Sequence, residues 1–240
     1  MGRTFTRALQ TRGFQYRVTP RGIAGSGSDP GQDGDNAPKL SEAAAARRKA
    51  LLLTARACFF ASGYGATTMS EVAAKAGGSK TTLWSYFPSK ERLFAAVVDD
   101  ILADHCTALS VELPVEGEVE AVLEAFGHAL LESLLSSPML ELYRLIIGEA
   151  ARFPQLAGHF YDRGPKIGRA RLASWMGAKI ELCELRPASP AALANLFASM
   201  CLNGEYQRTL LSLTASNQSE AIATELGTAV ETFCAAWKTS

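Results

Sequence analysis

The chain has 240 residues, of which 48% are hydrophobic and 20% charged, enough apolar material for one large or two small domains. No run is long and apolar enough for a membrane span, and the first residues lack the apolar core of a signal peptide. Five cysteines, odd in number and without paired spacing, favour a reducing cytoplasm over a disulfide framework.

The charges are unevenly distributed along the chain, although the net charge is zero. Residues 1–38 carry five basic and three acidic residues. Residues 39–100 carry nine basic and five acidic residues, and residues 101–240 carry ten basic and sixteen acidic residues. The net charges of these segments are therefore +2, +4 and −6. A basic front suits a protein whose N-terminal part meets a polyanion, although chance clustering would give the same counts.

Residues 1–38 are predicted to be disordered. Residues 22–38 are rich in Gly, Ser, Asp and Pro, and the five preceding arginines are accompanied by only a few aromatic residues. Three interpretations stay open: an extension without a role, which we place first, an arm that touches DNA, and a transit peptide, which we place last.

The first predicted helix covers residues 41–62 and carries an apolar stripe of Leu52, Ala55 and Phe59. Gly63 is expected to end it. From residue 40 onward no period-two alternation is sustained and the linkers are short. The sequence therefore predicts an all-α fold.

Two short helices follow, at about 69–76 and 80–87, and a glycine pair makes a tight turn between them. Thr68 begins the first in a capping box, in which its hydroxyl accepts from the backbone N–H of Glu71. Ser79 is expected to cap the second, and a proline stops it.

Helical patterns continue to the C-terminus. Residues 90–110 are predicted as one helix, roughly 30 Å long at 1.5 Å per residue, that ties front to rear. Further helices are expected at 119–136, 139–153, 155–180, 190–213 and 218–238. We therefore divide the chain into an N-terminal three-helix domain at 39–90 and a C-terminal helical domain at 91–240.

The segment 63–94 carries the functional signal. Its second short helix has Ser, Lys and Thr residues on one side and Leu83 and Phe87 on the other. The apolar side is expected to pack against Phe59, Val72 and Ala73. Two short helices around a tight turn, with a polar flank on the second, are typical of a helix-turn-helix, whose second helix enters the major groove.

Residues 50–94 resemble the TetR (tetracycline-repressor-like) family of regulators. The matching elements, in order, are Gly63-Tyr64, Thr67-Thr68, Glu71-Val72-Ala73, Ala76-Gly77, Ser79-Lys80, Thr82-Leu83-Trp84 and Tyr86-Phe87-Pro88-Ser89-Lys90-Glu91. Two positions depart from the family pattern: Gly78 stands where Val is usual, and Thr81 where Gly is frequent. The operator sequence therefore cannot be borrowed from relatives.

The resemblance implies DNA contacts by nine residues: Thr68, Ser79, Lys80, Thr81, Thr82, Trp84, Ser85, Tyr86 and Lys90. Lys80 and Thr81 would lie nearest the base edges, and Lys90 would hold a phosphate beside the N-terminus of the fourth helix. The alternatives are that Trp84 packs on the first helix, that Thr68 only caps, and that Lys90 is a solvated surface lysine.

Residues 138–165 are similar, less specifically, to the C-terminal domain of the AefR-like subgroup. Because a small headpiece reads few base pairs, we expect a homodimer on a pseudo-palindromic double-stranded DNA operator. The apolar faces of residues 191–213 and 220–238 would pair across the dimer in a four-helix bundle, or form an intramolecular core.

A pocket for a small-molecule effector is expected between the middle helices, walled by apolar and aromatic side chains. The candidates are Phe126, His128, Tyr143, Arg144, Ile147, His159, Phe160, Trp175, Met176 and Phe197. Each is alternatively plain core, and Arg144 alternatively pairs with Glu141 or Glu149.

No catalytic site, metal site or cofactor is expected. The three histidines lie far apart, and the sequence has no Cys-x-x-Cys, phosphate-cradling glycine loop or nucleophile elbow. A single cysteine acting as an oxidation sensor is an open alternative to buried cysteines.

We therefore predict a dimeric repressor that a small ligand releases from its operator by population shift. Two rivals stay open. One is a helical ligand-binding protein without DNA binding, and the other is a helical enzyme with a convergent titratable site in its rear part.

Overall fold

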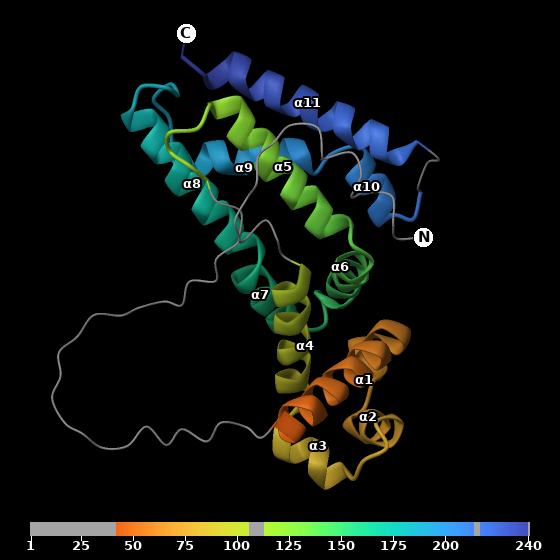
Figure 1. The fold of residues 1–240 in the computed structure, drawn as a ribbon. Coiled ribbons are helices and arrows are strands. Elements are labelled where there is room, and N and C mark those ends of the chain that lie inside the picture. The colour runs from red at the N-terminus through yellow and green to blue at the C-terminus, as the bar shows by residue number, and fades with distance from the viewer. Residues whose placement is uncertain (1–41, 106–112, 214–216, 240) are drawn as a thin grey trace, which may run out of the picture. The chain divides into compact units, whose positions relative to one another are not determined.

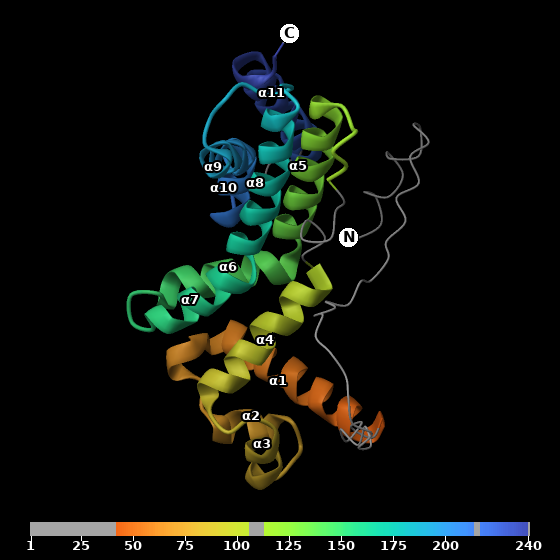
Figure 2. The same cartoon turned by 90° about the vertical axis from the view of Figure 1, so that its left-hand side faces the viewer.

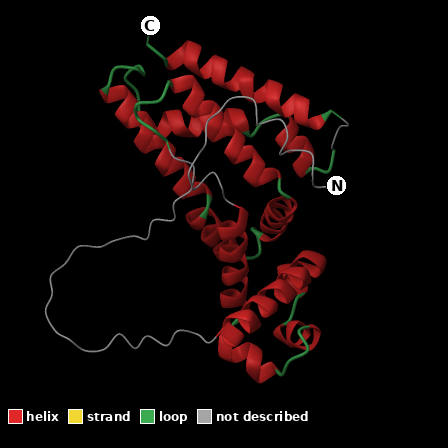
Figure 3. Cartoon of the chain, viewed as in Figure 1, coloured by secondary structure: helices red, strands yellow, loops and turns green. Residues whose placement is uncertain are grey.

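The computed structural model describes residues 42–105, 113–213 and 217–239, which contain helices and no strand (Figures 1 and 3). The predicted all-α class is confirmed. The predictions for residues 1–38 lie outside the described residues. The helices are α1 (Glu42–Ala66), α2 (Met69–Lys75), α3 (Lys80–Tyr86), α4 (Lys90–His105), α5 (Val119–Leu135), α6 (Ser137–Glu149), α7 (Pro154–Arg163), α8 (Pro165–Glu181), α9 (Pro190–Cys201), α10 (Glu205–Leu210) and α11 (Gln218–Trp237).

Residues 40–240 form one compact unit. Within it, α1–α3 gather at one end, α8–α11 gather at the other, and α4 lies between them (Figures 1 and 2). Among the described helices, none is both long enough and apolar enough to cross a membrane.

The end of α1 differs from the prediction. Gly63 takes a left-handed conformation (φ 79°, ψ 163°) that interrupts the helix, and a further turn follows to Ala66. The hydroxyl of the buried Thr67 donates to the Gly63 carbonyl at 2.7 Å and closes this turn. Gly63 therefore ends the regular part of α1, as predicted, and the prediction missed the turn that follows it to Ala66.

The caps of α2 and α3 are confirmed. The Thr68 hydroxyl accepts from the backbone N–H of Glu71 at 3.2 Å, and the Ser79 hydroxyl accepts from that of Thr82 at 3.1 Å. Phe87 is already extended, because the residue before a proline disfavours helical backbone. The helix therefore ends one residue earlier than predicted.

Two predicted long helices are each broken in two. The predicted helix 155–180 divides at Gly164, where Pro165 follows and begins α8. The predicted helix 190–213 divides into α9 and α10, because Gly204 takes a positive φ of 53°. The break between α7 and α8 helps to shape a cavity described below, because Gly164 and Pro165 line it.

The buried residues form two apolar clusters. The first joins α1–α4 to α6 and α7, and it holds Leu83 and Phe87 together with Phe59, Val72 and Ala73, as predicted. The second joins α5, α8, α9 and α11. The apolar faces expected to pair across a dimer, including Phe197 and Phe233, are buried in this second cluster. The intramolecular alternative therefore holds for those faces.

Candidate functional site

The exposed flank of α3 is the candidate nucleic-acid interface. Ser79, Lys80, Thr81 and Ser85 are exposed, and Thr82 and Tyr86 are half-buried, while the opposite side of α3 is in the core. Trp84 is 48% exposed, so it does not pack fully on α1 as the alternative required. The predicted polar flank thus faces outward along the whole helix.

Hydrogen bonds within α3 hold this flank in place. The hydroxyls of Ser79 and Thr82 lie 2.9 Å apart, and the Ser85 hydroxyl donates to the Thr82 carbonyl at 2.8 Å. Lys80 makes no ion pair or hydrogen bond with any described side chain, so its ammonium group is available to a partner. Thr68 is exposed while it caps α2.

Lys90 is placed differently from the phosphate contact that the resemblance implied. Its Nζ atom donates to the carbonyls of Tyr64 (3.0 Å), Gly65 (3.3 Å) and Thr67 (3.0 Å), and it lies 4.4 Å from the centre of the Tyr64 ring. An ammonium group has three protons, and these carbonyls take all of them. Lys90 therefore caps the kinked end of α1 in this conformation and has no proton left for a phosphate.

Arg47 is a basic residue at the helix-turn-helix that the sequence reasoning missed. Its Nη2 atom lies 2.2 Å from where a Cβ of residue 78 would stand, so the guanidinium occupies the space that Gly78 leaves open. Arg48 lies nearby, with its Cζ 5.3 Å from the centre of the Phe87 ring. The departure of Gly78 from the family pattern thus makes room for a positive charge at the turn.

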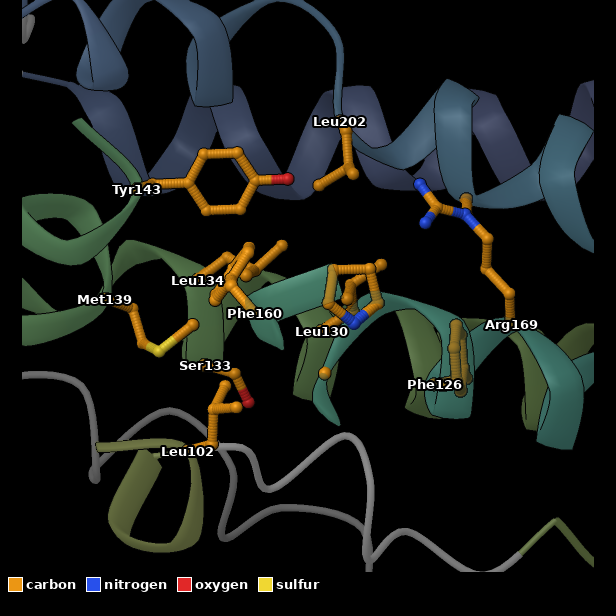
Figure 4. A pocket seen from close by; sticks show the side chains of 14 residues that line it. Leu102, Phe126, Leu130, Ser133, Leu134, Met139, Tyr143, Phe160, Arg169 and Leu202 are labelled. Atoms are coloured by element: carbon orange, nitrogen blue, oxygen red, sulfur yellow. The ribbon is translucent and has the colours of Figure 1, made fainter. Parts of the chain in front are cut away.

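A small apolar cavity lies in the rear part of the unit, with a volume of about 60 Å³ (Figure 4). Phe126, Tyr143 and Phe160 line it, as predicted. The sequence reasoning missed the other lining residues, which come from α4, α5, α6, α8, α9 and the segments beside them: Leu102, Leu130, Ser133, Leu134, Met139, Gly164, Pro165, Gly168, Arg169, Ala198 and Leu202.

Three predicted aromatic and apolar lining residues are core residues instead. Trp175, Met176 and Phe197 are buried in the second cluster, and the Trp175 indole N–H donates to the Pro114 carbonyl at 3.0 Å. Periodicity identified them as inward-facing but could not tell which neighbours they meet. Ile147, in contrast, is 57% exposed on α6.

The three predicted polar ligand contacts also lie elsewhere. The His128 side chain is half exposed beside Glu124. The His159 Nε2 atom lies 3.1 Å from Asp99 Oδ1 on α4. Arg144 donates to the carbonyls of Leu210 (2.8 Å) and Thr209 (2.7 Å), so it caps α10 and pairs with neither of the glutamates considered.

Two helices connect the cavity to the helix-turn-helix. On α4, Leu102 lines the cavity and Lys90 holds the end of α1. On α6, Tyr143 lines the cavity, and Glu149 at the far end accepts a hydrogen bond from the backbone N–H of Gly65 at 2.9 Å. A displacement of either helix at the cavity would therefore reach α1 directly.

Within the described residues, no group of three or more His, Cys, Asp or Glu side chains stands close enough to hold a metal ion. Burial raises the pKa of the Cys201 thiol to about 12 and that of Cys234 to about 11. Both thiols are therefore poor nucleophiles and poor candidates for an oxidation sensor.

Comparison with known proteins gives matches over both parts of the chain. The family model described as bacterial regulatory proteins of the tetR family matches residues 51–97. The model described as the C-terminal domain of AefR-like transcriptional repressors matches residues 121–239.

Curated relatives match over limited stretches of the chain. The HTH-type transcriptional regulator RutR of Escherichia coli is 45% identical over 64 residues, which are 27% of this chain and 30% of RutR. The HTH-type transcriptional activator FasR of Mycolicibacterium smegmatis is 37% identical over 84 residues, which are 33% of this chain and 38% of FasR. The chain thus spans only about a third of the length of these relatives.

A solved structure extends the likeness to almost the whole described unit. The Flavonoid-responsive Regulator FrrA has a TM-score of 0.69 and is 30% identical, and the match covers 81% of this chain and 98% of that one. The fold and both of its parts are therefore shared with a regulator of known structure, and these relatives are regulators rather than enzymes.

Proposed function

Because the chain belongs to the TetR family of transcriptional regulators, we propose that it is a repressor that binds an operator as a homodimer and is released by a small-molecule effector. The observation that carries the proposal is the geometry of α3, whose polar flank is exposed while Leu83 and Phe87 are buried beneath it. A helix held in this way can enter the major groove without uncovering the core.

The DNA contacts are proposed at the residues that this flank presents. Lys80 and Thr81, at the start of α3, would read base edges, and Trp84 and Ser85 would meet bases or phosphates along the groove. Ser79, Thr82, Tyr86 and Thr68 would complete the surface. Lys90 is left out, since it caps α1.

Effector binding is proposed to act through α4 and α6. A molecule that enlarges the cavity would displace Leu102 or Tyr143, and the two helices would carry the change to the carbonyls and the amide at the end of α1. The helix-turn-helix would then prefer a different distance from that of the second subunit. The free energy of operator binding would become less favourable by the coupling energy between the effector site and the DNA-binding site.

The homodimer is proposed to use the outer faces of α9 and α11. These faces expose small residues, among them Ala192 and Ala223, together with Leu196, which is 42% exposed. Small side chains let helices approach closely in a four-helix bundle. Leu196→Glu should shift the protein toward monomer in sedimentation velocity, while the same change at the exposed Leu53 on α1 should not.

The sign of regulation and the compartment are proposals as well. The C-terminal match to a repressor domain favours repression, although the relative FasR is described as an activator. An operator-binding protein acts where the DNA is, which in a bacterial cell is the cytoplasm.

The test is a fluorescence titration of the full chain against genomic fragments at two salt concentrations. Lys80→Ala should weaken binding and lower its salt dependence by about one counterion. The control is Lys166→Ala, which removes a lysine that pairs with Asp162 on the far part of the unit and should leave binding unchanged. Equal affinities for the wild type and Lys80→Ala would remove Lys80 from the interface. Absence of binding to any fragment would leave a helical ligand-binding protein.

A further inference from the structure

Few of the side chains that line the cavity are polar. Three lining residues carry a polar side-chain end. The Ser133 hydroxyl donates to the Ala129 carbonyl at 2.8 Å, whereas the Tyr143 hydroxyl on α6 and the Arg169 guanidinium on α8 make no described hydrogen bond. Figure 4 shows the latter two groups pointing toward one another from opposite sides, with Leu202 beside them. The remaining lining side chains are mostly apolar and include Phe126, Leu130 and Phe160.

Arg169 lacks a counterion within the described part of the chain. Its one described interaction is electrostatic, with Tyr143, whose pKa burial raises and the guanidinium lowers. The neighbouring cations of the same region are neutralised: Lys166 pairs with Asp162 at 2.9 Å, and Arg163 lies 3.0 Å from Asp99. A partly buried guanidinium without a carboxylate is costly, so a ligand that supplies one is favoured.

The surroundings of Arg169 reinforce a preference for negative charge. Helix α8 begins at Pro165, which itself lines the cavity, so the positive end of the helix dipole faces the same space. The Tyr143 hydroxyl makes no described hydrogen bond and can donate to an acceptor. Two donors and a helix N-terminus thus line the same mostly apolar cavity.

We propose that the effector is an apolar, ring-sized organic acid whose carboxylate or phenolate accepts hydrogen bonds from Arg169 and Tyr143, while its ring lies against Phe126, Leu130 and Phe160. This inference rests on the proposed function and names the chemical class of its effector. A cavity of about 150 Å³ holds benzene, whereas this one measures about 60 Å³. A ring can therefore enter only by moving the walls, and DNA release follows where the displaced wall is Leu102 on α4 or Tyr143 on α6.

The test compares acids with neutral molecules of the same shape. Binding of 2-naphthoate and 2-naphthamide, and of benzoate and benzamide, is measured by calorimetry on the full chain. The wild type should bind each acid roughly tenfold more tightly than its amide, as expected for a charge-assisted hydrogen bond. Arg169→Met should bring that ratio close to one without weakening the amide, and Arg169→Lys, which keeps the charge, should retain much of it.

The control variant is Lys166→Met, which removes a positive charge from the same helix outside the cavity and should leave the ratio unchanged. A second readout is the yellow phenolate band of 4-nitrophenol near its own pKa. The band should grow on binding to the wild type and not on binding to Arg169→Met, because the guanidinium stabilises the phenolate.

The proposal is overturned by either of two results: equal binding of acid and amide to the wild type, including no binding of both, or an acid preference that survives Arg169→Met. DNA binding is measured on the same samples without added probe. If the protein binds DNA but shows no acid preference, only the proposed effector class is wrong. If the protein does not bind DNA either, the proposed function fails.

Discussion

Lys90→Met separates a structural role from a DNA contact at this position. Methionine keeps the unbranched shape of the side chain, one atom shorter, but removes the ammonium group that donates to the carbonyls of Tyr64, Gly65 and Thr67. A hydrogen bond to a charged group contributes about 1.5–3 kcal/mol, and a cation–π contact with the Tyr64 ring contributes about 0.5–1 kcal/mol. Because Lys90 is only partly buried, water would replace part of the hydrogen bonding that the variant loses.

We therefore expect Lys90→Met to lower the free energy of unfolding by about 2 kcal/mol. In a chain of this size such a loss corresponds to a fall in Tm of about 4–8 °C, since each kcal/mol shifts Tm by about 2–4 °C. The assay is a urea titration followed by circular dichroism, together with the salt dependence of operator binding. The matched control is Lys80→Met, because the exposed Lys80 pairs with no described side chain.

The two variants should behave in opposite ways. Lys80→Met should keep the stability of the wild type within about 0.5 kcal/mol and reduce the salt slope by about one, whereas Lys90→Met should lose stability and keep the slope. Unchanged stability together with a reduced slope for Lys90→Met would refute the capping role and restore the phosphate contact that the family resemblance implied.

Three further outcomes follow from single contacts. Gly78→Val should displace the Arg47 guanidinium, so its effect on operator affinity and that of Arg47→Ala should be non-additive by at least about 0.5 kcal/mol in a double-mutant cycle; additivity would mean that Arg47 does not act at the turn. Glu149→Ala should cost about 2 kcal/mol of stability in urea and speed hydrogen exchange at the Gly65 amide, and unchanged exchange would rule out that hydrogen bond. Phe197→Ala should cost about 3–5 kcal/mol in the same titration, because Phe197 is fully buried; a cost below about 1 kcal/mol would contradict its place in the core.

Local chemistry made much of the front of the chain predictable. The caps at Thr68 and Ser79, and the burial of Leu83 and Phe87, depend on residues a few positions apart, so sequence patterns report them directly. The role of Lys90 depends on carbonyls more than twenty residues away, which a kink at Gly63 exposes. No short-range pattern contains that information.

The rear of the chain was less predictable for the same reason. Helical periodicity showed which faces are apolar, but it could not distinguish a cavity wall such as Phe126 from a core residue such as Trp175. The break at Gly164 could have been predicted, because Pro165 follows it. A helix boundary at this pair would have made the first turns of α8, and with them Arg169, candidates for the cavity lining.

The small size of the cavity links recognition to release. Because a ring needs more than twice the available volume, an effector must displace part of the cavity wall, and that wall includes Leu102 on α4 and Tyr143 on α6. The first residue of α4, Lys90, and the last residue of α6, Glu149, both bind backbone groups of Gly65 near the end of α1. Packed helices shift as rigid rods. An opening that moves α4 or α6 should therefore reach the helix-turn-helix through α1, and a ligand small enough to leave these walls in place should bind without releasing DNA.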